Sequence, residues 1–307
     1  MYCKYVGIDM AYDWDDMRVF LAVARGESLS KAGKALKLDP ATVGRRIARL
    51  EERLGAALFA KSVQGYVLNS EGERLLTHAT RAETALTQGA EEVVGEAGQL
   101  SGVVRIGAPD GAANFLLPQV CAAICDDNPG LEVQIIALPR VFNLSKREAD
   151  MAITLSRPTA GRLMAQKIAD YKLHLAATQG YLDNHPAIKS LKDLKRHRMI
   201  GYIPDMIFDK EVDYLGQAGV ERVTLASNSV AVQVNWVRQG AGIAIVHDFS
   251  MPTLPDIRRV LPDKVSLTRT FYLVRHLDDR RVERLNRFAE QLGHGLRREV
   301  ARLEGQV

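Results

Sequence analysis

The chain has 307 residues, of which 41 are lysine or arginine, 37 are acidic and 47% are hydrophobic. This length predicts about two domains, each large enough to bury its own core. The three cysteines form no metal-like cluster, which favours a reducing compartment. No apolar run is long enough to span a membrane, and residues 1–13 lack the apolar segment of a signal peptide. We therefore expect a cytoplasmic protein without a membrane-spanning segment.

The excess positive charge is concentrated near the N-terminus. Residues 14–68 contain ten lysines and arginines and six acidic residues, whereas residues 69–307 contain 30 and 29. A protein that binds DNA needs positive charge to neutralise phosphates and release their counterions. The distribution therefore indicates that residues 14–68 contact DNA and that the remainder need not.

Residues 15–54 predict three helices in succession. In the first, apolar residues recur at helical spacing: Met17, Phe20, Leu21 and Ala24. The second begins at Ser28, a favourable N-cap, and its predicted inward-facing residues are Ala32, Ala35 and Leu36. A tight connection at Lys37 and Leu38 leads to the third helix. This arrangement predicts a helix-turn-helix.

The third helix, within residues 36–55, has two distinct faces. Asp39 is a good N-cap and Pro40 suits the first helical position. The apolar face consists of Val43, Ile47, Leu50 and Leu54, and the opposite face of Thr42, Arg45, Arg46, Arg49 and Arg53. A basic helix face is often only a solvated surface, but arginine also makes bidentate contacts with guanine edges and phosphates. Following a short capped helix, this face predicts a recognition helix.

The sequence from Trp14 to Phe59, with a predicted wing around Gly65, resembles the winged helix-turn-helix of LysR-type transcriptional regulators. The resemblance extends over nearly the whole chain. It implies a winged helix-turn-helix domain over 14–69, a linker helix over 70–97 and an effector-binding domain over 102–307. The last is expected to be an α/β domain of two lobes, like periplasmic solute-binding proteins. Lobe I would take about 102–166 and 269–307, and lobe II about 167–268.

The resemblance also implies which residues contact DNA. We expect Arg45 and Arg49 to reach bases or groove edges, Thr42 a base edge or phosphate, and Lys61 the backbone. The full predicted set is Ser30, Lys31, Pro40, Ala41, Thr42, Arg45, Arg46, Arg49 and Lys61. The implied partners are double-stranded DNA with an interrupted palindrome, a small-molecule effector and RNA polymerase.

The predicted linker helix carries an apolar seam at an average spacing of 3.5 residues, formed by Leu75, Ala79, Ala82, Leu86, Gly89 and Val93. This spacing is typical of a coiled coil. The alternative is a helix that packs against its own domain. We favour dimerisation, because a helix-turn-helix usually binds two half-sites through two-fold symmetry. A homodimer or homotetramer is therefore expected.

From residue 102 onward, short apolar strands alternate with helical segments. Strands are predicted at 103–106, 131–138, 149–155, 172–178, 223–227, 242–246 and 271–275, and a final helix at about 281–303. A turn at 107–112 would lead into a helix that contains Pro118. This alternation predicts α/β layers with a largely parallel sheet.

Ligands of α/β folds bind at the carboxyl ends of strands. On that basis the predicted effector site comprises Pro109, Asp110, Gly111, Pro139, Arg140, Tyr202, Pro204, Asn228, Ser229, His247 and Asp248. Helix starts near Gly111 and Ser229 favour a carboxylate, which Arg140 would clamp. Asp110 and Asp248 favour an amine instead. An amino acid would satisfy both signs.

Two other functions are considered. A redox sensor would use Cys3, Cys121 or Cys125, but the helical spacing of Cys121 and Cys125 separates their Cβ atoms by about 5–6 Å, too far for a disulfide. Cys121 is therefore predicted to be a buried apolar residue. An enzyme is disfavoured, because metal and nucleophile motifs are lacking. A solute-binding module is disfavoured, because it would leave residues 14–68 unexplained and would normally carry a signal peptide. His247 and Asp248 are adjacent on a strand and so point to opposite faces. We expect no enzymatic activity, metal or cofactor.

Overall fold

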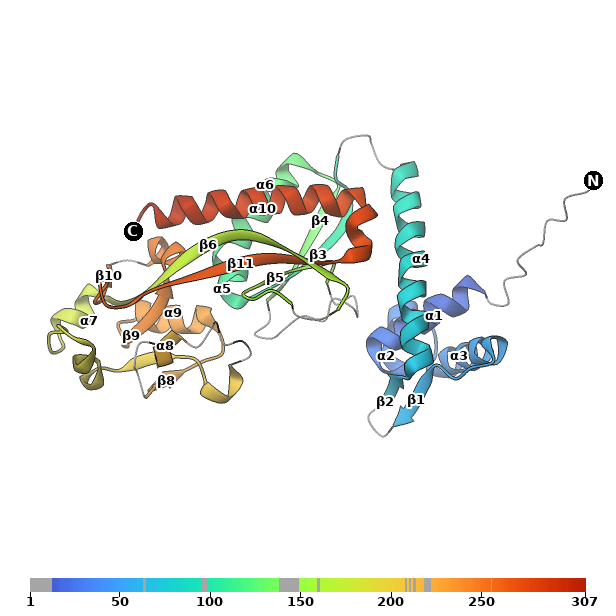
Figure 1. Cartoon of the computed structure of the whole chain (residues 1–307), viewed down its shortest axis with the longest axis horizontal. Coiled ribbons are helices and arrows are strands. Elements are labelled where there is room, and N and C mark those ends of the chain that lie inside the picture. The colour runs from blue at the N-terminus through green and yellow to red at the C-terminus, as the bar shows by residue number, and fades with distance from the viewer. Residues whose placement is uncertain are drawn as a thin grey trace, which may run out of the picture. The chain divides into compact units, whose positions relative to one another are not determined.

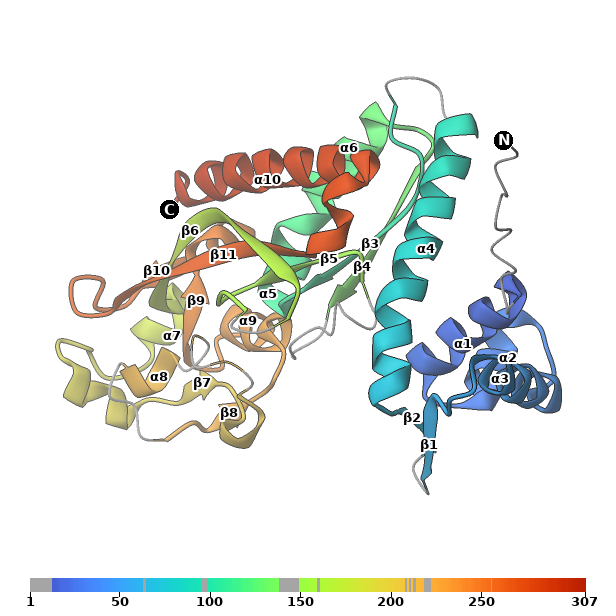
Figure 2. The same cartoon turned by 45° about the vertical axis from the view of Figure 1, so that its right-hand side comes forward.

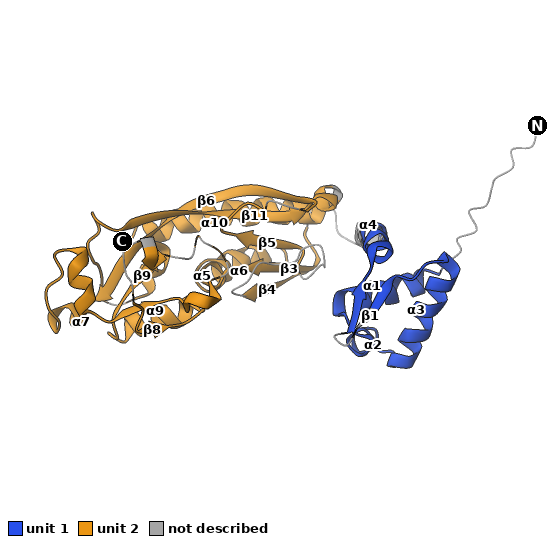
Figure 3. Cartoon of the chain, turned by 60° about the horizontal axis from the view of Figure 1, so that its bottom comes forward, with its two compact units in different colours: residues 1–94 blue, residues 95–307 orange. Residues whose placement is uncertain are grey.

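A computed structural model of the chain describes residues 13–62, 65–94, 99–137, 149–158, 161–207, 209, 211, 214–217, 222–254 and 256–307. The chain divides into two compact units, residues 1–94 and 95–307 (Figure 3). Each unit has its own hydrophobic core. Among the described residues, no helix is both long and apolar enough to cross a membrane.

Unit 1 is a winged helix-turn-helix, which confirms the predicted fold of this region. Its helices are α1 (Trp14–Gly26), α2 (Leu29–Leu36) and α3 (Pro40–Leu54), followed by strands β1 (Phe59–Ser62) and β2 (Gly65–Leu68) (Figure 1). The side chains of Ser28 and Asp39 cap α2 and α3, as predicted. The core of the unit contains apolar residues of all three helices, including Phe20, Val43 and Leu50.

The turn between α2 and α3 is tighter than the sequence pattern suggested. Lys37 adopts a left-handed conformation at φ 56°, and the amide of Leu38 donates to the carbonyl of Gly33 over 2.9 Å. This close approach buries Gly33, whereas Ala35 is exposed. The prediction that Ala35 faces inward was therefore wrong, because the chain reverses over the Gly33 side of α2.

The wing packs back onto the end of α1. Strands β1 and β2 pair antiparallel, with Phe59 opposite Leu68. The amide of Tyr66 donates to the carbonyl of Glu27 over 3.1 Å. Gly65 is required at this contact, because its φ is +126° and a Cβ atom would lie 2.4 Å from the same carbonyl oxygen.

Helix α4 (Ser70–Val94) follows the wing and belongs to unit 1. Leu76 and Ala79 are buried against the helix-turn-helix core, and Arg25 of α1 forms an ion pair with Glu83. Further along, Leu86 is 57% exposed. Of the predicted seam, Leu75 and Ala79 thus pack within their own unit, while Ala82 and Leu86 are exposed.

Unit 2 is built on a nine-stranded mixed sheet in the order β4-β3-β5-β11-β6-β9-β7-β8, with β10 paired to β6. Its strands are β3 (Gly102–Ala108), β4 (Leu131–Ala137), β5 (Met151–Thr154), β6 (Leu163–Thr178), β7 (Met199–Gly201), β8 (Leu225–Ala226), β9 (Ile243–His247), β10 (Ile257–Arg259) and β11 (Ser266–His276). The predicted strands are present, but the sheet is not largely parallel. The pairs of β6 with β9, β10 and β11, and of β5 with β11, are antiparallel.

The long strands β6 and β11 join two lobes (Figure 2). Lobe I holds β3, β4 and β5 with α5 (Asp110–Phe115), α6 (Leu117–Asp127) and the terminal helix α10 (Glu283–Glu304). Lobe II holds β7, β8 and β9 with α7 (Gln179–Asp183), α8 (Tyr214–Gln217) and α9 (Val230–Arg238). Short 3-10 helices cover 191–196, 204–206, 248–253 and 277–281. The two-lobed α/β fold is confirmed.

One predicted helix is in fact two. The segment after residue 109 forms α5 and then α6, with Leu116 between them in a non-helical conformation. Pro118 lies in the first turn of α6, where its missing amide hydrogen is tolerated. The proline therefore begins a helix instead of interrupting one.

Candidate functional sites

The exposed surface of the helix-turn-helix includes most of the predicted DNA-binding residues. Ser30, Lys31, Pro40, Ala41 and Arg45 are exposed, and Thr42 is half-buried. Lys61 lies in β1, but its side chain is outside the described part of the structure, so its contact with DNA stays a prediction.

A short hydrogen-bonded chain orders the start of α3. Asp39 Oδ1 accepts from the amide of Thr42 over 2.8 Å, and Arg45 donates from Nη2 to Thr42 Oγ1 over 2.8 Å. The hydrogen bonds from Thr42 hold the pKa of Asp39 below its ordinary value. Arg45 projects from this exposed first half of α3 and forms no ion pair with the described residues. Its guanidinium is thus available to a groove edge or a phosphate.

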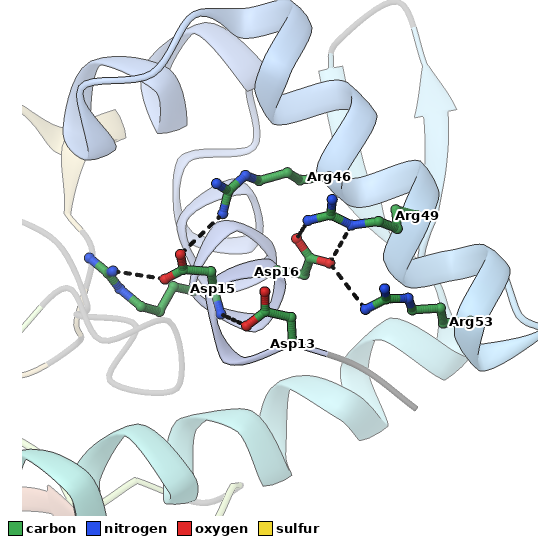
Figure 4. A network of polar contacts seen from close by, with 7 residues as sticks. Asp13, Asp15, Asp16, Arg46, Arg49 and Arg53 are labelled. Carbon is green, nitrogen blue, oxygen red and sulfur yellow. Dashed lines mark hydrogen bonds and ion pairs between the residues drawn. The ribbon is translucent and has the colours of Figure 1, made fainter. Parts of the chain in front are cut away.

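The other arginines of α3 lie against α1 (Figure 4). Arg49 donates to both carboxylate oxygens of Asp16, and its Nε is 2.7 Å from Asp16 Oδ2. Arg46 Nη1 lies 3.5 Å from Asp15 Oδ2. Contact of Arg49 with a base or groove edge stays a prediction; in the structure its guanidinium forms an intramolecular ion pair. Its partner lies 33 positions upstream, a distance that helical spacing cannot bridge.

In unit 2, six of the predicted effector residues line one pocket between the lobes. The pocket is lined by Pro109, Asp110, Gly111, Ala112, Leu155, Tyr171, Tyr202, Tyr214, Asn228, Val230, His247 and Phe271. The sequence analysis missed Tyr171, Tyr214 and Phe271, because they read as ordinary apolar positions. The pocket encloses about 10 Å³, roughly the space of one water-sized sphere. Its own side chains fill it, so a metabolite can enter only if these side chains or the lobes move.

Aromatic rings form the wall of this pocket. Tyr171 stacks on Phe271 at a centroid distance of 4.1 Å, and Tyr214 meets the His247 ring edge-on at 6.0 Å. Burial raises the pKa values of Tyr171, Tyr202 and Tyr214, so their phenols stay protonated. Burial also lowers the pKa of His247 to about 3, which keeps its ring neutral at pH 7. Among the described residues, no hydrogen-bond partner reaches His247 Nδ1.

Asp110 joins the two lobes at the edge of the pocket. Its Oδ2 accepts from the amide of Ala231 over 2.9 Å and from Ser229 Oγ over 3.1 Å. Ser229 is the N-cap of α9, so the carboxylate of lobe I lies at the N-terminus of a lobe II helix. That N-terminus is a favourable position for an anion. The predicted anion position is therefore occupied by a side chain of the protein itself.

The other predicted effector residues that the structure describes are not in the lining of the pocket. Asp248 is fully buried and pairs with His174 Nδ1 over 2.8 Å and with Arg259 Nη2 over 2.7 Å. The strand β9 ends at His247, and Asp248 begins the 3-10 helix 248–253, where its carboxylate is already paired inside the protein and does not line the pocket. Pro204 lies in a 3-10 helix outside the lining. Pro139 and Arg140 lie outside the described residues.

The sequence of this two-unit chain matches two family descriptions. Residues 14–73 match the bacterial regulatory helix-turn-helix protein of the lysR family, and residues 97–297 match the LysR substrate binding domain. The chain belongs to the LysR family of transcriptional regulators. It is 28% identical over 235 residues to the HTH-type transcriptional regulator PtxR of Pseudomonas aeruginosa, covering 75% of each chain.

Solved structures share the fold of this LysR-type regulator. Full-length OxyR from Pseudomonas aeruginosa is similar with a TM-score of 0.67 and 16% identity, covering 93% of this chain and 97% of that chain. Full-length LysG from Corynebacterium glutamicum, solved with bound effector Arg, has a TM-score of 0.63 and 16% identity, covering 94% and 98%. These likenesses establish the arrangement of a helix-turn-helix domain and a two-lobed regulatory domain.

The cysteines of this LysR-type regulator give no support to redox sensing. Cys121 is buried and Cys125 half-buried, and both are free thiols. Burial raises the pKa of Cys121 to about 12 and also raises that of Cys125. Because the thiolate is the reactive form, both are poor redox centres. Cys3 lies outside the described residues.

Proposed function

We propose that this LysR-type regulator binds promoter DNA as a homodimer or homotetramer and that a metabolite between the lobes modulates this binding. The observation that carries the proposal is the contact from Asp110 to the N-terminus of α9, at the edge of the filled pocket. A ligand that enters must change this contact. It would then favour one lobe arrangement over another, which is the condition for shifting a conformational equilibrium.

An amino acid is the effector class that fits this contact best. Its carboxylate would take the place of Asp110 at the amide of Ala231 and the hydroxyl of Ser229. Asp110, once displaced, would accept from the ammonium group. The aromatic walls would hold the side chain. LysG, a protein of the same fold, was solved with bound Arg, and this supports an amino acid here.

A thermal-shift screen of the full chain with amino acids, simple carboxylates and amines tests the effector. A true ligand at a hundred times its Kd should add about 2.7 kcal/mol of stability. Asp110→Asn should weaken the binding of an amino acid by about 10- to 100-fold, because a hydrogen bond to a charged group contributes about 1.5–3 kcal/mol. Asp126→Asn, which changes an exposed carboxylate on α6, is the matched control. Amino acid affinity that is equal in both variants would contradict the role of Asp110.

The DNA contact of this proposal rests on the exposed start of α3. We expect Arg45→Ala to weaken operator binding by about 10- to 100-fold, because a bidentate base contact is worth about 1–3 kcal/mol. Fluorescence anisotropy with a duplex selected by the protein from a random pool would measure it. Arg74→Ala, on the exposed side of α4, serves as control. If the two variants bound the operator with equal affinity, Arg45 would not contact DNA.

Dimerisation is assigned to the exposed half of the α4 seam. Leu86 is 57% exposed, and Ala82 and Gly89 are exposed beside it at heptad-like spacing. A second copy of α4 would cover these residues and place two recognition helices on an interrupted palindrome. RNA polymerase remains a proposed partner, on the resemblance alone.

A further inference from the structure

The carboxylate of Asp16 is the most deeply buried acid of the DNA-binding unit. It lies in the first turn of α1 with an exposed fraction of 0%, beneath the middle of α3. The guanidinium of Arg49 donates two hydrogen bonds to it, from Nε to Oδ2 over 2.7 Å and from Nη2 to Oδ1 (Figure 4). Arg53 approaches the same carboxylate at 3.9 Å. This is the bidentate fork geometry that gives the strongest arginine–carboxylate contacts.

The neighbouring ion pair is of a different kind. Asp15 and Arg46 are 3.5 Å apart, and their side chains are 52% and 28% exposed. Such an exposed pair contributes little and can open when a phosphate approaches. Asp16, in contrast, cannot be rehydrated while α1 and α3 stay packed. Removing Arg49 from it would leave the buried charge with only the more distant Arg53, at 3.9 Å, which is unfavourable.

The fork also fixes the guanidinium of Arg49 against α1, although 46% of its side chain stays exposed. Two of its N–H groups face Asp16, and the charge of the pair sums to zero. Arg45, one turn earlier, donates only to the neutral Thr42 hydroxyl. The two arginines thus differ in their partners: Arg45 is bonded to a neutral hydroxyl of its own helix, and Arg49 to a carboxylate of α1.

We propose that Asp16 is a positioning residue for DNA recognition: it withdraws Arg49 from the interface and leaves the charged contacts of α3 to Arg45 and to Arg46, whose pair can open. In this arrangement Arg49 neutralises no phosphate. Its charge raises neither the affinity for arbitrary DNA nor the salt dependence of binding. Asp16 therefore limits non-specific binding and favours the sequence-dependent contacts at the start of the helix.

The salt dependence of DNA binding tests this proposal, because its slope counts the phosphates neutralised. We expect Asp16→Asn to free the charge of Arg49 and to steepen the plot of log K against log salt by about 0.9 per chain. The variant should bind a scrambled duplex more tightly at low salt, so the ratio of specific to scrambled affinity falls. The specific duplex is one selected by the wild-type protein from a random pool. A slope that is unchanged or shallower would overturn the proposal.

A paired variant separates positioning from folding. Asp16→Asn with Arg49→Gln removes both charges and keeps two hydrogen-bonding side chains of similar size. We expect its slope to equal that of the wild type, since the pair contributes no net charge to the interface. If Arg49 did contact a phosphate in the wild type, the slope would fall by about 0.9 per chain, and the proposal would be wrong. Circular dichroism at each salt concentration would show whether the folded fraction is constant, because only a folded fraction that changes with salt could alter the slope without a change in DNA contacts.

Discussion

Replacing Gly33 by alanine is expected to destabilise the helix-turn-helix by about 1–3 kcal/mol, the usual cost of overpacking. A Cβ atom at this position would lie 2.6 Å from the carbonyl oxygen of Leu38, which is a backbone atom and cannot rotate away. The turn would have to open, and α3 would lose its position relative to α2. DNA binding should therefore fall as well. Hydrogen exchange of the α1–α3 amides in the full chain would measure the loss of stability.

Gly44→Ala is the matched control for this prediction. Gly44 lies inside α3, where a Cβ atom would meet Leu29 at an ordinary distance of 3.5 Å. Alanine there should stabilise the helix by up to about 1 kcal/mol, because glycine is a poor helix former. Opposite signs for two glycine-to-alanine changes in one unit would identify the tight turn as the cause. Equal effects would mean that the Gly33–Leu38 approach imposes no steric limit.

Local patterns were sufficient to predict the elements of the fold. The i, i+3, i+4 recurrence of apolar residues located α1 and α3, and the caps Ser28 and Asp39 located the starts of α2 and α3. The burial of Cys121 also followed from its helix face. These features depend on neighbours within one or two turns, and such neighbours are visible in a single sequence.

Long-range contacts could not be predicted in this way. Nothing in the spacing of α3 distinguishes Arg45 from Arg49, because the difference arises from Asp16, on another helix. The same is true of Asp110, whose partners Ser229 and Ala231 lie 119 and 121 positions away. Both acids were visible in the sequence as charged residues near helix starts. Their partners are determined by how the elements pack together, and the spacing of apolar residues along the sequence gives no information on that packing.

The sheet of unit 2 shows a third kind of limit. Alternating strands and helices predicted α/β layers correctly, yet the long strands β6 and β11 return antiparallel to their neighbours. Strand direction depends on how the chain crosses between lobes. The two-lobed fold therefore followed from the resemblance, whereas the alternation alone suggested a simpler parallel sheet.

Acidification is expected to destabilise the two-lobed unit through His247. Burial lowers the pKa of this ring to about 3, below its ordinary value near 6.5. Between these two values the unfolded chain binds a proton that the folded chain does not, so stability falls as the pH falls. The slope is about 1.4 kcal/mol per pH unit, or roughly 3 kcal/mol between pH 6.5 and 4. Urea unfolding of the full chain, followed in unit 2 at several pH values, would measure it.

The comparison of two histidine variants isolates this contribution from that of the carboxylates. Between pH 6.5 and 4, the free energy of unfolding of His247→Asn should fall by about 3 kcal/mol less than that of the wild type. His294→Asn removes an exposed ring on α10 and should follow the wild type. If the free energy of unfolding depended on pH in the same way for all three proteins, burial would not be keeping His247 neutral. A weaker dependence of stability on pH in His247→Asn alone would mean that the lobes close on an uncharged ring. That ring packs closely on Gly111, where an added Cβ atom would lie 3.2 Å from His247 Cε1. Protonation of His247 and entry of a ligand would then have the same requirement: the residues that line the pocket must separate, so that water or the ligand can reach the ring.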